Sequence, residues 1–445
     1  MKKFLIGLLA CLCIGTTSLG FAGCNVGGNT GGGSSNKESS VADSEKTFDS
    51  EEKNNENTSS GSDGADEESD FSIENSESEE SNASVDDSED EEKQELLASE
   101  GLEYTLSEDE TYYIVTGIGI CRDTDIVIPS IHNDLPVTTI GSHAFSHYSR
   151  LTSVVIPDSV TIIGSHAFSS CNSLTKIYYN ATECLQVGDG VFTTSDGIEG
   201  GIAVVIGANV KSIPAYLFGV HPYSRSGSKI CSVKFEEGSI CKSIGDSAFF
   251  RCYNLTEIVL PASVTSIGNS AFAGCYNLTE IVIPDSVTSI GEYTFGDCQS
   301  LTEIIIPDSV TSIGKGAFYY CCSLTEIVVN ENNTAYQSID GNLYTKDGGT
   351  LVQYAIGKTN MSFIIPDGVT SIGDNAFDNC KSLTNLVIPD SVISIGWYAF
   401  SYCDSLTSIT FNGTVEEWNA IEKRETWNDY VPATEVVCTD GTVAL

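Results

Sequence analysis

The stretch Leu278–Ser300, LTEIVIPDSVTSIGEYTFGDCQS, decides the fold. Its near-copy LTEIVLPASVTSIGNSAFAGCYN precedes it, and LTEIIIPDSVTSIGKGAFYYCCS follows it. Self-similarity at a fixed period of roughly 20–50 residues is typical of arrays in which each repeat packs only against its neighbours. The chain of 445 residues is therefore predicted to contain one repeat array rather than several globular domains.

Alignment of the copies gives columns of identical residue type, which predict the course of one coil. Leu278, Ile281 and Ile283 alternate as the inward side of a parallel strand would. Pro284 ends that strand because proline cannot donate to a ladder. After a second short strand, Gly291 turns the chain toward a short helical turn. The phenylalanines that pack this turn form a further column: Phe145, Phe168, Phe249, Phe272, Phe295, Phe318, Phe377 and Phe400.

The first residues of the chain predict export. Residues 1–23 begin with a basic pair, continue with an almost wholly apolar run and end in small residues, as signal peptides do. The motif FAGC at 21–24 resembles a bacterial lipobox, so we expect a lipid on Cys24. A lipobox ending at Cys11, an ordinary cleaved signal and an uncleaved apolar anchor stay open as alternatives.

Residues 24–100 are predicted to be a disordered acidic tether, rich in Gly, Ser, Asn and Glu. Residues 25–100 contain 24 acidic and four basic residues with few apolar ones, so they cannot bury enough surface to fold. The whole chain has 62 acidic and 21 basic residues and a net charge of −41. Binding to phosphate backbones needs Lys and Arg, so we expect no nucleic-acid partner.

The rest of the chain is predicted to consist of two caps and a solenoid. Residues 101–127 form the N-terminal cap, in which 104–119 alternate around the turn SEDE as a pair of strands. Residues 128–411 form the solenoid, interrupted at 330–360 by an insertion with turn signals. Residues 412–445, first more helical and then extended, cover the C-terminal end of the core.

Four motifs resemble the BspA-like leucine-rich repeat family of bacterial surface proteins: IPDSVTSIGxxAFxxCxSLTEI, IPSIHNDLPVTTIGSHAF, YQSIDGNLYTKDGGTLVQY and NGTVEEWNAI with VVCTDG. The resemblance covers about residues 104–445. It implies a right-handed solenoid and, for some members, adhesion to host proteins or other cells. It offers no catalytic residues to carry over. The expected fold is a mainly β repeat solenoid, a leucine-rich-repeat right-handed coil with parallel strands, short second strands and short helical turns.

Three columns on the predicted strands face away from the core, and in the central repeat they are Thr279, Glu280 and Val282. None is expected to have a role in the core. The acidic column contains Glu257, Glu280, Glu303 and Glu326, and the apolar column contains Val259, Val282, Ile305 and Val328. Carboxylates about 4.8 Å apart repel one another, so this ladder opposes folding. We interpret it as a binding surface for a basic, partly apolar partner or a divalent cation. A copied, solvent-screened surface is the alternative.

Aromatic residues at variable positions on the turn side are the second set of candidates, since they could stack on sugars or anchor a protein. They are Tyr276, Tyr293, Tyr319, Tyr320, Trp397 and Tyr398. Scattered exposed aromatics are also normal on protein surfaces.

The cysteines and histidines do not predict a metal site. No C-x-x-C pair occurs, and His143, His147 and His166 lack an identifiable fourth ligand. Seven cysteines share one column and are expected to be buried, unpaired fillers: Cys171, Cys252, Cys275, Cys298, Cys321, Cys380 and Cys403.

These features predict a non-catalytic, monomeric bacterial cell-surface lipoprotein that mediates protein binding or adhesion to host or neighbouring cells. It would need no cofactor and would be lipid-anchored at the extracellular face of the cytoplasmic membrane or the cell surface. Its partner would be a host matrix protein, a cell-surface protein or a glycan. A glycan-binding module of a polysaccharide-utilising system is the alternative. A hydrolase site in the insertion, resting on Asp340 and Asp347, ranks last.

Overall fold

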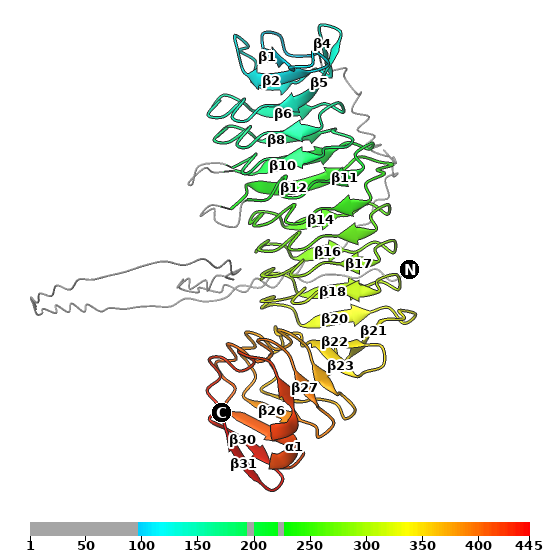
Figure 1. Ribbon diagram of the computed structural model, residues 1–445, viewed down its shortest axis with the longest axis vertical. Helices are drawn as coiled ribbons and strands as arrows, with labels where there is room; N and C mark the ends of the chain where they lie inside the picture. Colours follow the sequence, from blue (N-terminus) through cyan, green and yellow to red (C-terminus); the bar gives the residue numbers. More distant parts are fainter. Residues whose placement is uncertain (1–96, 194–199, 221–226) are drawn as a thin grey trace, which may run out of the picture. The chain divides into compact units, whose positions relative to one another are not determined.

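The computed structural model describes residues 97–193, 200–220 and 227–445. The predicted signal, Cys24 and the tether up to residue 96 lie outside these residues. The described residues form a β-solenoid of about 14 turns with parallel strands and almost no helix, which confirms the predicted fold class (Figure 1). Among the residues described, no helix combines the length and the apolar character needed to cross a membrane.

The central repeat Leu278–Ser300 forms one complete coil. Its first strand is β16 (Glu280–Val282) and its second is β17 (Ser289–Ile290), and the inward side chains of Ile281 and Ile290 are buried. The third side consists of single hydrogen-bonded turns. The N–H of Gly296 donates to the Tyr293 carbonyl oxygen, and the N–H of Cys298 to that of Phe295. These bonds span three residues, so the turns are tight and do not extend into helices.

The first strands of neighbouring coils stack in register (Figure 1). They form four ladders. The first contains β3 (Asp125–Val127), β6 (Ser153–Ile156), β8 (Lys176–Tyr179), β10 (Ile202–Ile206) and β12 (Ile230–Phe235). The second and third pair β14 (Glu257–Val259) with β16, and β18 (Glu303–Ile306) with β20 (Glu326–Val329). The fourth contains β24 (Ser362–Ile364), β26 (Asn385–Ile388), β28 (Ser408–Phe411), β30 (Glu435–Cys438) and β31 (Gly441–Ala444).

The second strands form three further ladders. One contains β1 (Glu103–Leu106), β2 (Tyr113–Gly117), β4 (Ile131–His132), β5 (Leu135–Ile140), β7 (Ile162–Ile163) and β9 (Gln186–Val187). The next contains β11 (Ser212–Ile213), β13 (Ser243–Ile244), β15 (Ser266–Ile267), β17 and β19 (Ser312–Ile313). The last contains β21 (Tyr336–Ile339), β22 (Asn342–Thr345), β23 (Thr350–Gln353), β25 (Ser371–Ile372), β27 (Ser394–Ile395) and β29 (Glu422–Lys423).

Both ends of the array depart from the repeat. The strand pair predicted around SEDE is confirmed, because β1 runs antiparallel to β2. At the other end, α1 (Val415–Ala420) begins with a capping box in which Thr414 and Glu417 satisfy each other's backbone N–H groups. Beyond α1, β29 and β30 extend the two sheets by one degenerate coil, and β31 closes the edge as an antiparallel partner (Figure 1).

Side chains tie each coil to the one before it. Phenylalanine rings from Phe145 to Phe318 stack with centroids 5.1–5.9 Å apart. The column cysteines are free and buried, as predicted. Six of them also donate to a phenylalanine carbonyl oxygen in an earlier coil. The Cys298 thiol lies 3.3 Å from the Phe272 carbonyl oxygen, one coil back. Polar and apolar side chains inside the turns therefore both lock neighbouring coils together.

The insertion divides the core into two parts, one from Leu102 to Leu343 and one from Tyr344 to Cys438. β21, β22 and β23 are successive antiparallel neighbours, and β23 then restores parallel pairing with β25. The side chain of Tyr354 replaces phenylalanine in the ring column and stacks on Phe377 at 5.0 Å. The coil that carries the insertion therefore lacks the usual Phe-x-x-Cys turn.

Candidate binding surfaces

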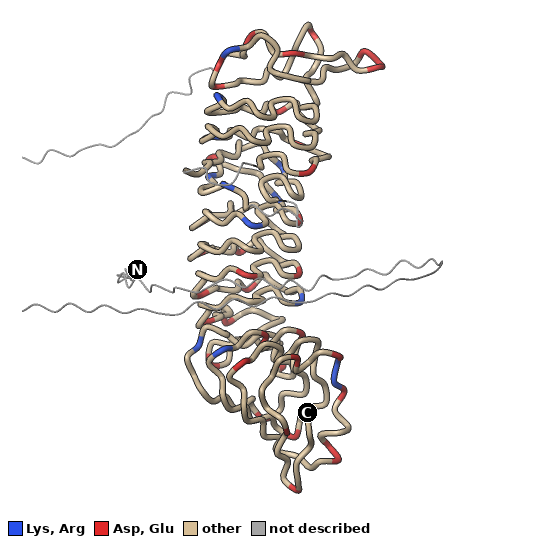
Figure 2. The backbone as a smooth tube through the Cα atoms, turned by 90° about the vertical axis from the view of Figure 1, so that its left-hand side faces the viewer, with Lys and Arg blue, Asp and Glu red and all other residues tan. Residues whose placement is uncertain are grey.

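The strand side of the central coils carries the predicted acidic and apolar columns. Glu257 lies opposite Glu280 and Glu303 opposite Glu326, but β16 and β18 belong to separate ladders. The expected run of four equally spaced carboxylates is therefore two opposed pairs. Along the described coils, Figure 2 shows acidic and basic residues scattered with no continuous basic band.

Three successive coils carry exposed residues of the apolar column, with Val259, Val282 and Ile305 exposed to 70%, 54% and 50%. Val328 is half-buried because the insertion lies against β20, where the N–H of Ile327 donates to the Gly341 carbonyl oxygen. Exposed β-branched side chains in register on neighbouring strands form a contiguous apolar patch, which differs from single apolar residues scattered over a surface. The free part of this surface is thus centred on β14, β16 and β18.

The insertion also changes the surroundings of Glu326. Lys358 lies close enough for the two charges to interact, although burial is the main influence on this lysine and lowers its pKa. The carboxylates of Glu257, Glu280 and Glu303 have no cation within ion-pair distance in the described part of the chain. The binding role predicted for Glu326 and Val328 therefore has less support than the role predicted for the other residues of the two columns.

Thr279 has a structural role that the sequence did not reveal. Its hydroxyl donates to the Thr256 carbonyl oxygen at 3.1 Å, and Thr325 makes the same bond to Thr302 at 3.2 Å. Thr279 is exposed, so it has no role in the core, but its hydroxyl bonds the neighbouring coil. A repeated threonine here ties successive first strands together, at about 1 kcal/mol for each such bond.

The tyrosines on the turn side occupy an unusual backbone conformation. Tyr293, Tyr320 and Tyr398 have φ values of 52°, 58° and 54°. This left-handed region costs a residue with a Cβ about 1–2 kcal/mol, and Gly316 fills the Tyr293 position in the next coil. The column of Tyr293 and Tyr398 also holds His143, His166, Ser247, Ser270 and Asn375 at φ values of 53–59°, so this conformation belongs to the repeat and does not select tyrosine.

Part of the predicted aromatic set gathers just before the insertion. The ring of Tyr319 packs edge-on against Tyr293 at 5.8 Å and lies 5.9 Å from Tyr320. Tyr276 stacks on Tyr253 at 4.6 Å, one coil earlier. Trp397 and Tyr398 are exposed on a later coil, and among the described residues they make no ring contact with this group.

Two carboxylates beside these rings were not singled out from the sequence. Burial raises the pKa of Asp297, whose carboxylate accepts a bond from the Gln299 amide at 2.9 Å. Asp378 is only 3% exposed, and burial raises its pKa to about 7. One signal was available: Asp378 stands where other copies carry small residues such as Ala273, Gly296 and Ser401.

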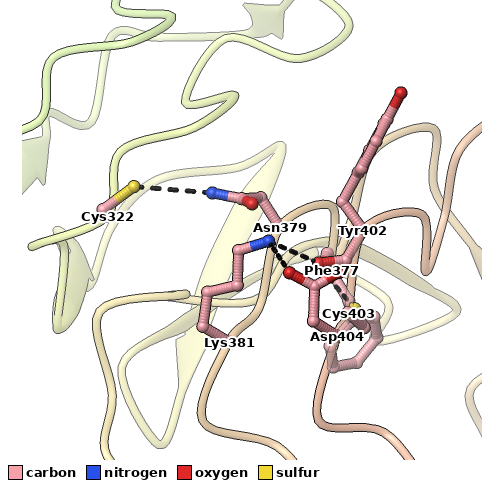
Figure 3. A network of polar contacts seen from close by, with 7 residues as sticks. All are labelled: Cys322, Phe377, Asn379, Lys381, Tyr402, Cys403 and Asp404. Atoms are coloured by element: carbon pink, nitrogen blue, oxygen red, sulfur yellow. Dashed lines mark hydrogen bonds and ion pairs between the residues drawn. The ribbon is translucent and has the colours of Figure 1, made fainter. Parts of the chain in front are cut away.

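Figure 3 shows the polar contacts around Asn379 and Lys381 on this part of the turn side. The Asn379 amide donates to the Cys322 sulfur at 3.6 Å across the insertion. The Lys381 ammonium lies 2.5 Å from an Asp404 carboxylate oxygen and 3.0 Å from the Tyr402 carbonyl oxygen. Polar contacts thus link the turns on either side of the insertion.

The acidic pair proposed for a hydrolase lies in two different turns of the insertion. The Asp347 carboxylate accepts bonds from the Thr345 hydroxyl at 2.6 Å and the Gly349 N–H at 2.9 Å, and these bonds lower its pKa. Asp340 has a φ of 50° in the turn between β21 and β22. Asp347 thus shapes the turn between β22 and β23, and its lowered pKa does not suit a proton donor.

The protein-family model of the BspA type leucine rich repeat region matches this chain in six copies, over residues 123–224, 220–344 and 352–421. A leucine-rich cell surface protein from Faecalibacterium prausnitzii is 26% identical, with a TM-score of 0.47, over 73% of this chain and 97% of its own. A leucine-rich repeat protein from Bacteroides ovatus is 24% identical, with a TM-score of 0.47, over 77% and 76%. The pneumococcal vaccine antigen PcpA is 18% identical, with a TM-score of 0.46, over 77% and 87%.

No curated protein matches the chain significantly. The family match covers more than half of the chain and includes the central repeat that was quoted first. The chain therefore belongs to the BspA-type leucine-rich repeat family of bacterial surface proteins.

Proposed function

We propose that this protein is a non-catalytic surface receptor that captures a protein with basic and apolar side chains. The observation that carries the proposal is the uncovered strand side of β14, β16 and β18. There, Val259, Val282 and Ile305 are at least half exposed beside a column of glutamates. Opposed like charges raise the free energy of the fold. A basic partner would relieve that repulsion while it covered the apolar column.

The decisive variant replaces Glu257, Glu280, Glu303 and Glu326 together with Gln. It should be more stable than the parent, by about 0.2–1 kcal/mol for each opposed pair, because the repulsion is gone. It should also lose partner capture in a pull-down against host matrix proteins, bacterial cells and polysaccharides, with and without calcium. Capture by the parent should weaken as salt rises.

A matched control changes the same amount of charge elsewhere. Asp158, Asp285, Asp367 and Asp390 are exposed in the turns after the first strands, and their joint replacement with Asn removes four charges from another side of the coil. This control should capture the partner as the parent does. Equal capture by the glutamine variant and the parent would refute the strand side as the binding surface.

We further propose that Cys24 carries the lipid that holds the receptor at the cell surface, with the acidic segment after it as a spacer. The support is the FAGC motif after an apolar run and the charge of residues 25–100. Two acyl chains on one cysteine anchor more firmly than a single short chain. Cys24→Ser should move the protein from the membrane fraction into the medium. Retention of the variant would favour an uncleaved anchor, and a soluble parent would favour an ordinary signal.

A glycan-binding module is the second candidate, favoured by the stacked and exposed tyrosines of the turn side. Tyr253 and Tyr276 stack on each other across adjacent coils at 4.6 Å, and Tyr402 stacks on Tyr430 at 4.7 Å. The polysaccharide arm of the same pull-down tests it. Capture of an insoluble glycan that survives the four glutamine substitutions would support this candidate over protein capture.

A further inference from the structure

β24 is hydrogen-bonded on one side only. From β26, the N–H of Asn385 donates to the Met361 carbonyl oxygen at 3.0 Å, and the N–H of Ile365 donates to β26 in return. Backbone groups of successive residues point to opposite sides of a strand, so those of Ser362 and Ile364 face away from β26. Among the described residues, no strand lies on that side, and no group bonds to the N–H or the carbonyl oxygen of either residue. The edge therefore offers free donors and free acceptors in alternation.

Two other strand edges of the array are covered by the chain itself. At the first end, the N–H of Ser99 donates to the Val127 carbonyl oxygen of β3 at 2.9 Å. At the insertion, the N–H of Ile327 in β20 donates to the Gly341 carbonyl oxygen at 2.9 Å. Proteins protect free edges with such segments, with charged side chains or with proline, because a free edge pairs with other chains. β24, with the sequence SFI, contains neither a charge nor a proline.

The open edge is accessible and partly apolar. Met361 and Ile364 are 64% and 65% exposed, and Ser362 is exposed as well. In the repeat, Ile364 stands in the apolar column, and Ser362 stands in the column that holds glutamate in the central coils. The edge therefore has no carboxylate of its own, and Ile364 offers apolar surface to a strand laid beside it.

The chemistry of this edge selects an extended polypeptide. Free N–H and carbonyl groups that alternate at strand spacing are matched in full by another backbone, which adds a strand to the sheet. β24 also lies within the array, because it follows the insertion along the chain and pairs with β26, so a single extended segment reaches it more readily than the edge of a second folded copy. The net charge of −41 favours a segment with basic residues.

We propose that β24 binds an extended segment of the protein partner as an added strand, with apolar side chains at alternate positions and lysines among the others. The inference rests on the function proposed above for the kind of partner, a protein with basic and apolar side chains. Backbone bonds to Ser362 and Ile364 provide the affinity, and the exposed Met361 and Ile364 side chains favour apolar residues beside them. The edge shares no residue with the strand side of β14, β16 and β18, so the two sites can be tested separately.

The test uses the full chain and the fluorescently labelled peptide acetyl-KVTVKV-amide, with binding followed by fluorescence anisotropy. The parent should bind the peptide saturably. Ile364→Lys places a charge of the peptide's own sign on the edge and should weaken binding at least about 10-fold. Ile393→Lys is the matched control, because Ile393 is 66% exposed but lies next to β27, among the second strands. This control should bind within about twofold of the parent.

A second peptide tests the backbone bonds on the parent alone, so the result does not depend on how well a variant folds. The same sequence N-methylated at every residue keeps the side chains but has no backbone N–H to donate, and it should not bind. Equal binding of the two peptides, or equal binding by the parent and Ile364→Lys, would overturn the proposal.

Other occupants of the edge give different results. A peptide that binds only after removal of residues 25–96 would assign β24 to the chain's own acidic segment, and a parent dimer that Ile364→Lys dissociates would assign it to a second copy. Either result overturns the proposal. The variant with four glutamines retains β24 and should still bind the peptide, even if it captures the partner as well as the parent does and so refutes the strand-side surface. Loss of peptide binding in that variant would place the peptide on the glutamate column and not on β24.

Discussion

Replacement of Gly291 with alanine is expected to destabilise the array by about 3 kcal/mol, near the upper end of typical overpacking penalties. A Cβ at this position would lie 2.5 Å from the Asn269 nitrogen and 2.6 Å from the Gly268 carbonyl carbon. Both atoms belong to the backbone of the preceding coil, so no side-chain rotation can relieve the clash. Gly314 faces the same obstacle one coil later, with the Glu292 nitrogen at 2.4 Å. Urea or thermal unfolding of the full chain measures the loss.

A glycine outside the coil contacts provides the comparison. A Cβ on Gly349 would meet only the Asp347 side chain, with its nearest oxygen at 3.3 Å, and that side chain can move. Gly349→Ala should therefore cost less than about 1 kcal/mol. Similar losses for the two variants would show that the glycine column is required for turn conformation and not for the close approach of coils.

The core was predictable because every repeat packs against a copy of itself. Leu278, Ile281 and Phe295 recur at one spacing, and in the structure all three are buried, with Phe295 stacked on its equivalent Phe272. A period in the sequence thus fixes the register between coils without knowledge of any single contact.

Repetition alone could not separate structural from functional polar residues. Thr279 and Glu280 both belong to repeated columns, yet of the two only the threonine hydroxyl has a bonded partner in the preceding coil among the described residues. The Ser286 hydroxyl makes a second bond between coils that the sequence did not predict, since it donates to the Val264 carbonyl oxygen at 2.5 Å. Which of two repeated polar groups reaches a neighbouring carbonyl depends on strand geometry that residue types do not specify.

Asp378 was missed for the opposite reason, because it breaks a column instead of repeating one. The insertion replaces one Phe-x-x-Cys turn, and Asp378 beyond it interacts electrostatically with Tyr319 before it. That neighbourhood arises from a local irregularity, so a method based on periodicity cannot reach it. Buried charged groups of this kind should be sought where one residue departs from a repeat at a position that small residues usually fill.

Phe295→Ala is expected to cost about 3–5 kcal/mol, the range for removal of a fully buried aromatic ring. Its ring is 0% exposed and stacks in parallel between Phe272 at 5.9 Å and Phe318 at 5.8 Å. In a one-dimensional array, stability is roughly the sum of the repeats and their nearest-neighbour contacts. Loss of this ring removes two such contacts at once and should uncouple the coils on its two sides. Phe295→Leu keeps most of the volume and should cost less than about 1.5 kcal/mol.

The insertion is expected to limit how far the destabilisation caused by Phe295→Ala extends along the array. The first ring stack ends at Phe318, and a second stack runs from Tyr354 through Phe377 to Phe400 in a separate part of the core. In Phe295→Ala, amide hydrogen exchange should therefore accelerate in β15, β17 and β19, while β25 and β27 keep the protection of the parent. Equal acceleration on both sides of the insertion would mean that the two stacks unfold as one unit. Acceleration that stops at the insertion would instead show that the insertion separates two units of cooperative unfolding.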